Sequence, residues 1–454
     1  MTHWSHDAIF YHIYPLGLCG APHTNPFDGS VAPRLRELHD WIEPMRTLGV
    51  NALYLGPLFE STSHGYDTVD YYTLDRRLGT NAMLAELANE LHRNGIRLIL
   101  DGVFHHVGRD FWAFRDLLTH QEASAYRDWF VEIDFSQRSP YGDPFSYASW
   151  DGYFNLVKLN LRNAEVRAHL FGAVQNWIEQ FDLDGLRLDV AELLDLEFLR
   201  ELRQVCKARK PDFWLMGEQV HGDYRRIANP DMLDATTNYE VYKGLYSSHN
   251  DHNYFEIAHS LKRQYGSEGV YRGLPLYNFV DNHDVPRVAS ILAEPAHLAP
   301  IYALLLTIPG VPAIYYGSEW GYGGVKSDDD ALLRPQLRLP EARVQAPYPE
   351  LADTLALLAD CRHRLPALRY GDYTQVHVAA EQLAFVRRYH EQFALVAVNA
   401  AASPVDLVLP MELPNGTVLM DWLNQGSDLI VNEGRVTLHV PARWASLLTR
   451  ASAT

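Results

Sequence analysis

Four short segments of the chain each lead from a run of β-forming apolar residues into a carboxylate. The segments span residues 99–106, 185–189, 215–218 and 279–284, and their carboxylates belong to Asp101, Asp189, Glu218 and Asp284. When strands of one parallel barrel end in acidic side chains, these gather at the C-terminal face, where barrel enzymes place their active sites. The four segments therefore predict a site built from carboxylates.

Two of these carboxylates have a basic neighbour. Arg187 stands two residues before Asp189, and His283 directly precedes Asp284. Because residues i and i+2 of a strand point to the same side, Arg187 can lie beside Asp189 and favour its ionised form. An ionised carboxylate in a barrel mouth can act as a nucleophile.

Length and composition fit a soluble globular protein with more than one domain. The 454 residues fit a barrel of about 250 residues with insertions and a smaller second domain. The net charge of −18 argues against nucleic acid or an anionic membrane as a partner. Aromatic residues make up 12% of the chain, and many stand in loops, where their flat faces suit sugar rings.

The chain carries no signal for export, membrane insertion or metal binding. Its N-terminus has neither a basic nor an apolar signal-peptide region, and no stretch approaches the roughly 20 apolar residues that span a bilayer. Cys19, Cys206 and Cys361 lie far apart and suggest neither a metal site nor a disulfide framework. We expect a cytoplasmic protein.

Eight predicted strands alternate with seven predicted helices, which favours a closed (β/α)₈ TIM barrel over an open sheet. The predicted strands are 8–14, 52–55, 96–100, 185–189, 213–217, 233–239, 277–280 and 313–316. The predicted helices are 35–48, 83–92, 166–181, 193–208, 255–265, 299–306 and 351–361.

Two regions depart from this alternation. Between residues 107 and 160 it lapses into a loop-rich, aromatic insertion after the third strand. From about residue 371, short strands follow at intervals of roughly 8–12 residues, which predicts an antiparallel β-sandwich. We therefore expect a barrel from residues 1–106 and 161–368, an insertion domain at 107–160, and a C-terminal β-sandwich domain at 369–454.

The four segments resemble, in order and spacing, the conserved regions of the alpha-amylase family, glycoside hydrolase family 13. Residues 64–71 and 157–160 are similar to further motifs of its neopullulanase, cyclomaltodextrinase and maltogenic amylase subgroup. The extra N-terminal β domain of that subgroup is expected to be missing, because the first strand starts within ten residues of Met1.

The resemblance implies three catalytic carboxyls. Asp189 matches the nucleophile and Glu218 the general acid and base, while Asp284 matches the third carboxylate, which stabilises the transition state. Retaining glycoside hydrolysis needs two carboxyls about 5–5.5 Å apart, one to attack the anomeric carbon and one to protonate the leaving oxygen. The apolar residues before Glu218 favour its protonated form. The structural alternative for each carboxylate is an ion pair or a helix cap.

The resemblance also implies a set of sugar-binding residues. His106 and His283 match histidines that hydrogen-bond the reacting sugar, Tyr66 matches its aromatic platform, and Asp101 matches an acid that orients other site residues. Arg187, beside Asp189, is expected among the substrate-binding residues. Asp330 and Arg334 match a pair that grips the next sugar. An i,i+4 salt bridge on a helix is the structural alternative for that pair.

The chain departs from the family pattern at two places. His105 stands where the family has an asparagine that contributes to a calcium site, and imidazole is a poor ligand for that hard cation. This argues against calcium there, and no other cofactor or metal is implied. After Glu218, residues 219–221 read Gln-Val-His instead of Ile-Trp-His, which leaves activity on α-1,6 branches open.

The expected function is a retaining α-glucan hydrolase with some transglycosylation. It would cut α-1,4 bonds in small α-glucans: maltooligosaccharides, cyclodextrins or short starch fragments. A glucanotransferase or a trehalose-synthase-type isomerase would use the same residues and stays an alternative. A catalytically inactive sugar-binding homologue would be marked by loss of Asp189 or Glu218, and both are present. The sequence predicts no oligomeric state.

Overall fold

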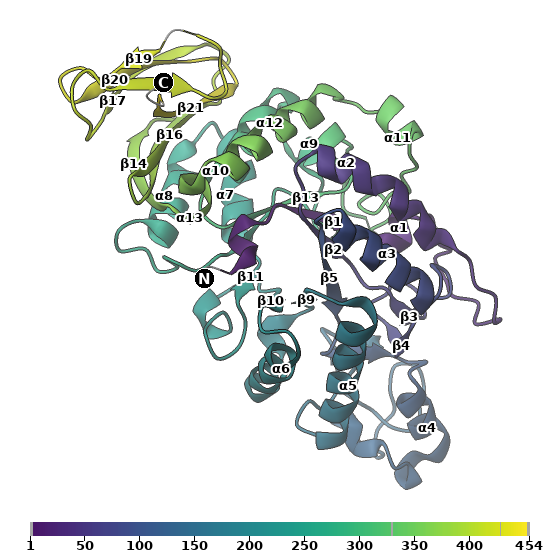
Figure 1. The fold of residues 1–454 in the computed structure, drawn as a ribbon. Helices are drawn as coiled ribbons and strands as arrows, with labels where there is room; N and C mark the ends of the chain where they lie inside the picture. Colours follow the sequence, from purple (N-terminus) through teal and green to yellow (C-terminus); the bar gives the residue numbers. More distant parts are fainter. Residues whose placement is uncertain (1–2, 328–329, 427, 452–454) are drawn as a thin grey trace.

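The computed structural model describes residues 3–327, 330–426 and 428–451. Eight parallel strands form one sheet in the order β11, β10, β9, β5, β2, β1, β13, β12 (Figure 1). Their bounds are β1 Phe10–Ile13, β2 Ala52–Leu55, β5 Arg97–Gly102, β9 Gly185–Leu188, β10 Trp214–Gly217, β11 Ala235–Thr236, β12 Tyr277–Asn278 and β13 Val311–Tyr315. Thr237, just after β11, pairs in parallel with Tyr277 of β12 and closes the sheet. The predicted TIM barrel is confirmed.

Alternation along the barrel strands separates two cores. Inward-pointing residues such as Phe10, Tyr54 and Trp214 pack together inside the barrel. Their neighbours Tyr11 and Leu53 pack outward against the helices. Strands buried on both faces are typical of parallel sheets covered by helices, and they explain the nearly continuous apolar runs in the sequence.

Twelve α-helices with the following bounds surround and extend this barrel in the described part of the chain, outside the insertion. They are α1 Pro15–Leu18, α2 Ile42–Thr47, α3 Asn81–Arg93, α5 Ala164–Phe181, α6 Leu196–Arg209, α7 Tyr239–Asn250, α8 Tyr254–Tyr265, α9 Val288–Ile291, α10 Leu298–Thr307, α11 Glu341–Val344, α12 Glu350–Arg364 and α13 Pro366–Tyr370. Several begin at side-chain caps, since Thr80, Asn163 and Asp195 accept hydrogen bonds from the first backbone N–H groups of α3, α5 and α6.

Three predicted elements differ in the structure. The helix expected at 35–48 is a 3₁₀ helix over Arg34–Trp41 followed by the short α2. Pro44 lies in the first turn of α2, where a missing N–H is tolerated, and it prevents one continuous α-helix. The helix expected from 193 begins at Leu196, because Asp195 caps it. The strand expected at 233–239 is only β11, and helix α7, which was not predicted, begins at Tyr239.

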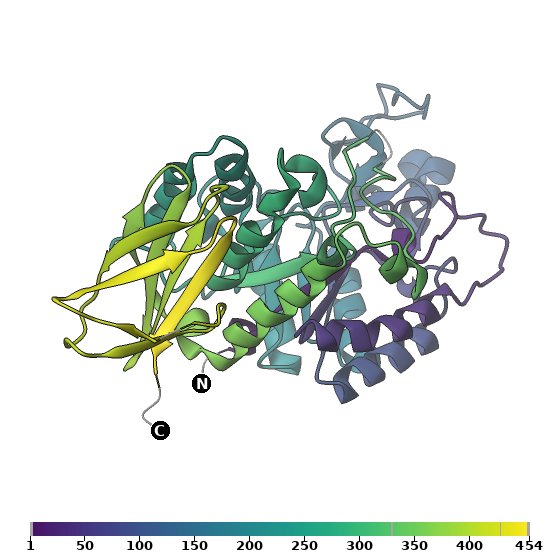
Figure 2. The same ribbon diagram turned by 90° about the horizontal axis from the view of Figure 1, so that it is seen from above.

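The insertion after β5 contains more regular structure than its sequence predicts. It holds helix α4 (Trp112–His120) and a small antiparallel sheet of β6 (His106–Gly108), β8 (Tyr153–Lys158) and β7 (Ser149–Trp150). A hairpin of β3 (Phe59–Ser61) and β4 (Thr68–Leu74) precedes it, in a segment that the sequence suggested was a loop. The insertion lies at the opposite end of the molecule from the C-terminal sheets (Figures 1 and 2).

The C-terminal region is a sandwich of two antiparallel sheets. The larger sheet has the order β14, β15, β16, β21, β18, β19, and β17 pairs with β20. Their bounds are β14 Asp372–Val378, β15 Gln382–Tyr389, β16 Gln392–Asn399, β17 Val405–Pro410, β18 Val418–Asp421, β19 Leu429–Ile430, β20 Arg435–Val440 and β21 Trp444–Arg450. Buried residues of both sheets, among them Leu395 and Leu438, form one core. The expected antiparallel C-terminal domain is confirmed, whereas the residue boundaries proposed for the domains stay a prediction.

No helix in the described ranges is long and apolar enough to cross a bilayer. Cys19, Cys206 and Cys361 are buried and unpaired.

One buried carboxylate holds together the elements that lead into β9. Asp184, directly before that strand, accepts hydrogen bonds from Lys210, Arg97, His92 and the backbone of Leu98, all at 2.8–3.0 Å. Burial alone would raise the pKa of Asp184, but the bonds from His92 and Lys210 outweigh burial and lower it to about 2. The start of the strand that carries Arg187 is thus fixed by an ion-pair network.

We expect Asp184→Asn to lower the free energy of unfolding by about 3 kcal/mol, because it removes the buried carboxylate that three partly buried basic side chains share. A carboxylate whose pKa is lower in the folded chain stabilises it above the unfolded pKa of about 3.9. This contribution is therefore complete near neutral pH and is lost as the pH falls towards 2. Urea unfolding at several pH values measures both effects. Asp406→Asn is the matched control, because Asp406 is an exposed carboxylate outside this network that pairs with the exposed His439. An equal loss in both variants would contradict the network's role.

Candidate active site

Every second side chain of a barrel strand points inward. The last of these side chains on each strand lies beyond the packed core, at the C-terminal end of the barrel, and these side chains form the candidate site. On β9, Gly185 points inward, so Arg187 and Asp189 do as well. A Cβ atom on Gly185 would lie 2.6 Å from the backbone oxygen of Trp214, which explains the glycine at this close approach. On β10, Trp214 points into the core, and Glu218, four residues later, points to the same side and lies at the barrel mouth.

Arg187 is the centre of the site. Its Nη1 lies 2.8 Å from Oδ1 of Asp189 and 3.0 Å from Oδ1 of Asp101, and its Nη2 lies 2.9 Å from Oε2 of Glu218. Since a guanidinium is a small planar group, carboxyls that share it must lie within a few ångströms of each other. The predicted contact between Arg187 and Asp189 is confirmed, and Glu218 joins it.

The shared guanidinium does not by itself set the charge of Asp189. Burial raises the pKa of Asp189, and the nearby carboxyls of Glu218 and Asp101 add to this against the opposing effect of Arg187. Arg187 favours the ionised form of Asp189 as expected, but burial and the two neighbouring carboxyls outweigh it and raise the pKa of Asp189 well above its usual range.

Glu218 is held by groups that the sequence did not single out. Its Oε2 accepts a hydrogen bond of 3.0 Å from the backbone N–H of Val190, and its Oε1 accepts one of 3.4 Å from the hydroxyl of Tyr239. Val190 has φ 48° and ψ 40°, a left-handed conformation that is rare for a β-branched residue. Backbone strain of this kind concentrates at functional sites, and here it aims an N–H group at Glu218.

Asp284 stands among basic groups on the other side of the mouth. His283 Nε2 lies 3.0 Å from its Oδ2, and Arg334 Nη2 lies 3.0 Å from its Oδ1. Desolvation would raise the pKa of Asp284, but His283 and Arg334 hold it well below its usual range. Arg334 also pairs with Asp330 at 3.2 Å. Residues 331–334 form a turn and not a helix, so the helical i,i+4 salt bridge does not apply.

Tyr66 connects the two sides of the site. Its hydroxyl lies 3.2 Å from Oδ2 of Asp101 and also contacts Nε2 of His283, whose ring is stacked on that of Tyr66. The Asp101 side chain has no exposed surface and also binds the hydroxyl of Tyr54 at 2.9 Å. Asp101 is therefore placed to orient Arg187 and Tyr66 and cannot reach a substrate.

His106 lies beside Asp189, with its Nε2 3.9 Å from Oδ2 of that carboxyl. Burial, with smaller effects from His105 and His64, lowers the pKa of His106 to about 3, so its ring is neutral. Its Nε2 has no protein partner and is free to bond a sugar hydroxyl.

His105 presents imidazole nitrogens where the family calcium site would need an oxygen. Its Nδ1 lies 3.2 Å from Nδ1 of His106, and its Nε2 has no partner. Burial and, to a lesser degree, Lys158 lower the pKa of His105 to about 4. A neutral imidazole pair does not fit Ca²⁺, which takes oxygen ligands. The absence of calcium at this position stays a prediction.

The structure brings all ten predicted site residues to one end of the barrel. The carboxyls at its centre are largely buried but keep some exposed surface: the exposed fraction of the side chain is 9% for Asp189, 13% for Glu218 and 31% for Asp284. Sequence reasoning missed Tyr14, Tyr54, Val190 and Tyr239. The ring of Tyr14 lies under Arg334, whose guanidinium carbon is 4.6 Å from the ring centre. Tyr14 directly follows β1 and Tyr54 lies near the end of β2. Their positions at the C-terminal ends of predicted strands could have identified them as site residues.

Comparison with known proteins agrees with this geometry. Residues 32–345 match the family described as "Alpha amylase, catalytic domain". The chain belongs to the alpha-amylase family of glycoside hydrolases.

Its similarity extends to particular members of that family. The chain is 31% identical to neopullulanase 2 of Thermoactinomyces vulgaris over an alignment that covers 96% of this chain and 76% of that protein. It is 29% identical to a cyclomaltodextrinase of Geobacillus thermopakistaniensis over 437 residues, 90% of this chain and 71% of that one. Among solved structures, the cyclic alpha-maltosyl-(1→6)-maltose hydrolase of Arthrobacter globiformis superposes with a TM-score of 0.83 at 27% identity, covering 99% of both chains.

Proposed function

We propose that the protein is a retaining α-glucan hydrolase that cleaves α-1,4-glucosidic bonds through a covalent glucosyl–enzyme intermediate. The observation that carries the proposal is the single guanidinium of Arg187, which binds the carboxyls of Asp189 and Glu218 at 2.8 and 2.9 Å. Two carboxyls on one guanidinium suit the narrow separation of about 5–5.5 Å used in retention. Inversion needs a wider gap that admits a water molecule between carboxyl and sugar.

In the first step, Glu218 gives its proton to the glycosidic oxygen while Asp189 attacks the anomeric carbon. The bond from that carbon to the leaving oxygen breaks, and an ester to Asp189 forms. In the second step, Glu218 takes a proton from water, whose oxygen attacks the anomeric carbon and releases Asp189. A sugar hydroxyl in place of water gives transglycosylation.

The other residues have supporting roles in this proposal. Asp284 is anionic and stabilises the positive charge that develops on the sugar ring in the transition state. His106 and His283 bond hydroxyls of the reacting sugar, and Tyr66 offers its ring as a platform. Asp330 and Arg334 bind the adjoining sugar. Oδ1 of Asp330 is buried without a hydrogen-bond partner and can accept a hydrogen bond from a sugar hydroxyl.

The proposed substrates are maltooligosaccharides, cyclodextrins and short starch fragments, because relatives of the chain are named cyclomaltodextrinase and neopullulanase. We also propose that the enzyme works in the cytoplasm, where its three unpaired cysteines stay reduced.

Product analysis tests the proposal. Fresh products from maltotriose, followed by NMR before they mutarotate, are expected to be α-anomers, because two displacements restore the configuration. First-formed β-anomers would rule out retention. A wider panel of cyclodextrin, pullulan, sucrose, trehalose and cyclic maltosyl-(1→6)-maltose defines the substrate class. Trehalose made from maltose would indicate an isomerase, and longer products formed only with added acceptor would indicate a glucanotransferase.

A further inference from the structure

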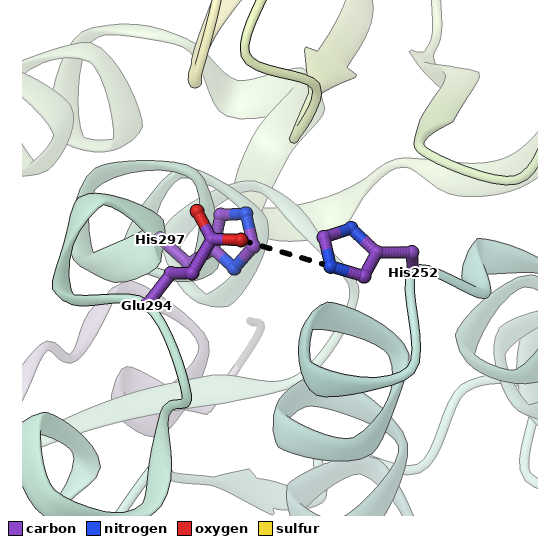
Figure 3. Close-up of side chains that lie close together, drawn as sticks. All are labelled: His252, Glu294 and His297. Atoms are coloured by element: carbon purple, nitrogen blue, oxygen red, sulfur yellow. Dashed lines mark ion pairs between the residues drawn. The ribbon is translucent and has the colours of Figure 1, made fainter.

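A second cluster of ionisable side chains lies far from the catalytic carboxyls, where the barrel meets the C-terminal sandwich. His252 lies in the link between α7 and α8, and Glu294 and His297 lie just before α10. Nε2 or Nδ1 of each histidine and one oxygen of Glu294 all lie within 4.8 Å of one another (Figure 3). Within the described ranges, no other group of three histidine, cysteine or acidic side chains has this spacing.

His297 has an unused ligand atom. The residue is 1% exposed, and its Nδ1 has no hydrogen-bond partner. Its Nε2 lies 3.2 Å from the backbone oxygen of Ala400, an acceptor, so Nε2 carries the proton and Nδ1 presents a lone pair. A buried, unsatisfied lone pair is costly unless it binds something.

His252 is oriented in the same way. Its Nδ1 lies 2.8 Å from Oε1 of Glu381 and donates to that carboxylate, so Nε2 is the ring atom left for a ligand. That Nε2 faces Oε1 of Glu294 at 3.7 Å, too long for a hydrogen bond. Histidines that donate their other N–H to a carboxylate or a backbone carbonyl are the usual arrangement around a bound metal.

Glu294 supplies the third donor. Its Oε2 pairs with Arg443 at 2.6 Å, so Oε1 remains for a ligand. The nearby His249 does not join the cluster, because its Nδ1 and Nε2 are bonded to the Leu245 carbonyl and the Tyr254 hydroxyl. Two imidazole nitrogens and one carboxylate oxygen form a donor set suited to Zn²⁺ and related transition metals.

We propose that His252, Glu294 and His297 bind one divalent transition-metal ion such as Zn²⁺, with solvent as the fourth ligand. Metal–ligand bonds of about 2.0–2.1 Å require ligand atoms about 3.4 Å apart. The ligand atoms lie within 4.8 Å of one another, so binding requires the partly exposed side chains of His252 and Glu294 to rotate inward. The groups that orient the three ligands, namely Glu381, Ala400 and Arg443, all belong to the C-terminal sandwich. The ion would therefore fasten the sandwich to the barrel and play no part in sugar cleavage.

The test titrates the chelator-treated full-length protein with Zn²⁺ alone, by calorimetry and by thermal unfolding. We expect one tightly bound ion per chain and a rise in Tm of several degrees, because the ion binds the folded state. Replacing Zn²⁺ by Co²⁺ should give the intense visible absorption of a four-coordinate site. The kcat/KM on maltotriose should be the same with and without metal.

Three variants separate a metal site from a simple ion pair. His252→Ala removes a partly exposed ligand and should weaken Zn²⁺ binding at least about 100-fold, while Glu381→Ala should weaken it about 10- to 100-fold. His439→Ala is the control, because His439 forms an exposed pair with Asp406 at 2.8 Å and should leave Zn²⁺ binding unchanged. No saturable binding to the wild-type chain, or equal binding by His252→Ala, would overturn the proposal. Because Zn²⁺ binding is measured without any sugar, this test does not depend on the proposed hydrolase activity.

Discussion

Replacing Asp189 by asparagine is expected to lower kcat on maltotriose by at least about 10⁴-fold, with the fold intact. The amide keeps the shape of the side chain but cannot form the glycosyl ester on which the proposed reaction depends. Steady-state rates at saturating maltotriose measure the loss, and circular dichroism checks the fold. Asp182→Asn makes the same change at an exposed carboxylate at the end of α5 and should keep full activity. Retention of even a few per cent of kcat by Asp189→Asn would remove Asp189 as the nucleophile.

A shorter side chain at the same position tests the stereochemistry directly. Asp189→Ala leaves space in which azide can attack an activated donor such as α-maltosyl fluoride. Because azide would enter from the face that Asp189 occupies, a single displacement should give the β-maltosyl azide. Formation of the α-azide would place the nucleophile elsewhere.

The parts of the site that follow from local spacing could be predicted from the sequence. Arg187 and Asp189 are two residues apart on one strand, so the period of a strand alone places them together, at 2.8 Å in the structure. The apolar runs before Asp101 and Glu218 likewise identified strands β5 and β10. Each of these predictions depends on a pattern shorter than ten residues.

The parts that depend on closure of the barrel could not be predicted in this way. Tyr14 and Arg334 meet because β1 lies beside β13 in the closed sheet, and Tyr239 reaches Glu218 because α7 starts directly after β11. Helix α7 itself was missed, since its sequence mixes tyrosine, serine and histidine without a clear apolar stripe. The left-handed Val190 was missed because valine disfavours that conformation, which only the surrounding structure can impose.

Glu218→Gln should lower kcat on maltotriose by about 10³- to 10⁴-fold, because the leaving glucose then departs without a proton. With α-maltosyl fluoride, whose leaving group needs no proton, formation of the intermediate should be much less affected. Its breakdown by water still needs a base, so the glycosyl ester on Asp189 should accumulate and be visible by mass spectrometry.

Azide should then rescue this variant, because an anionic nucleophile needs no general base. Two displacements, first by Asp189 and then by azide, should yield the α-maltosyl azide, the opposite anomer to that expected from Asp189→Ala. Glu179→Gln changes an exposed glutamate of α5 that pairs with Arg209, and it serves as the unaffected control. Identical anomers from the Asp189 and Glu218 variants would contradict the assignment of the two roles. Opposite anomers require that Asp189 attacks the anomeric carbon and that Glu218 acts only on protons.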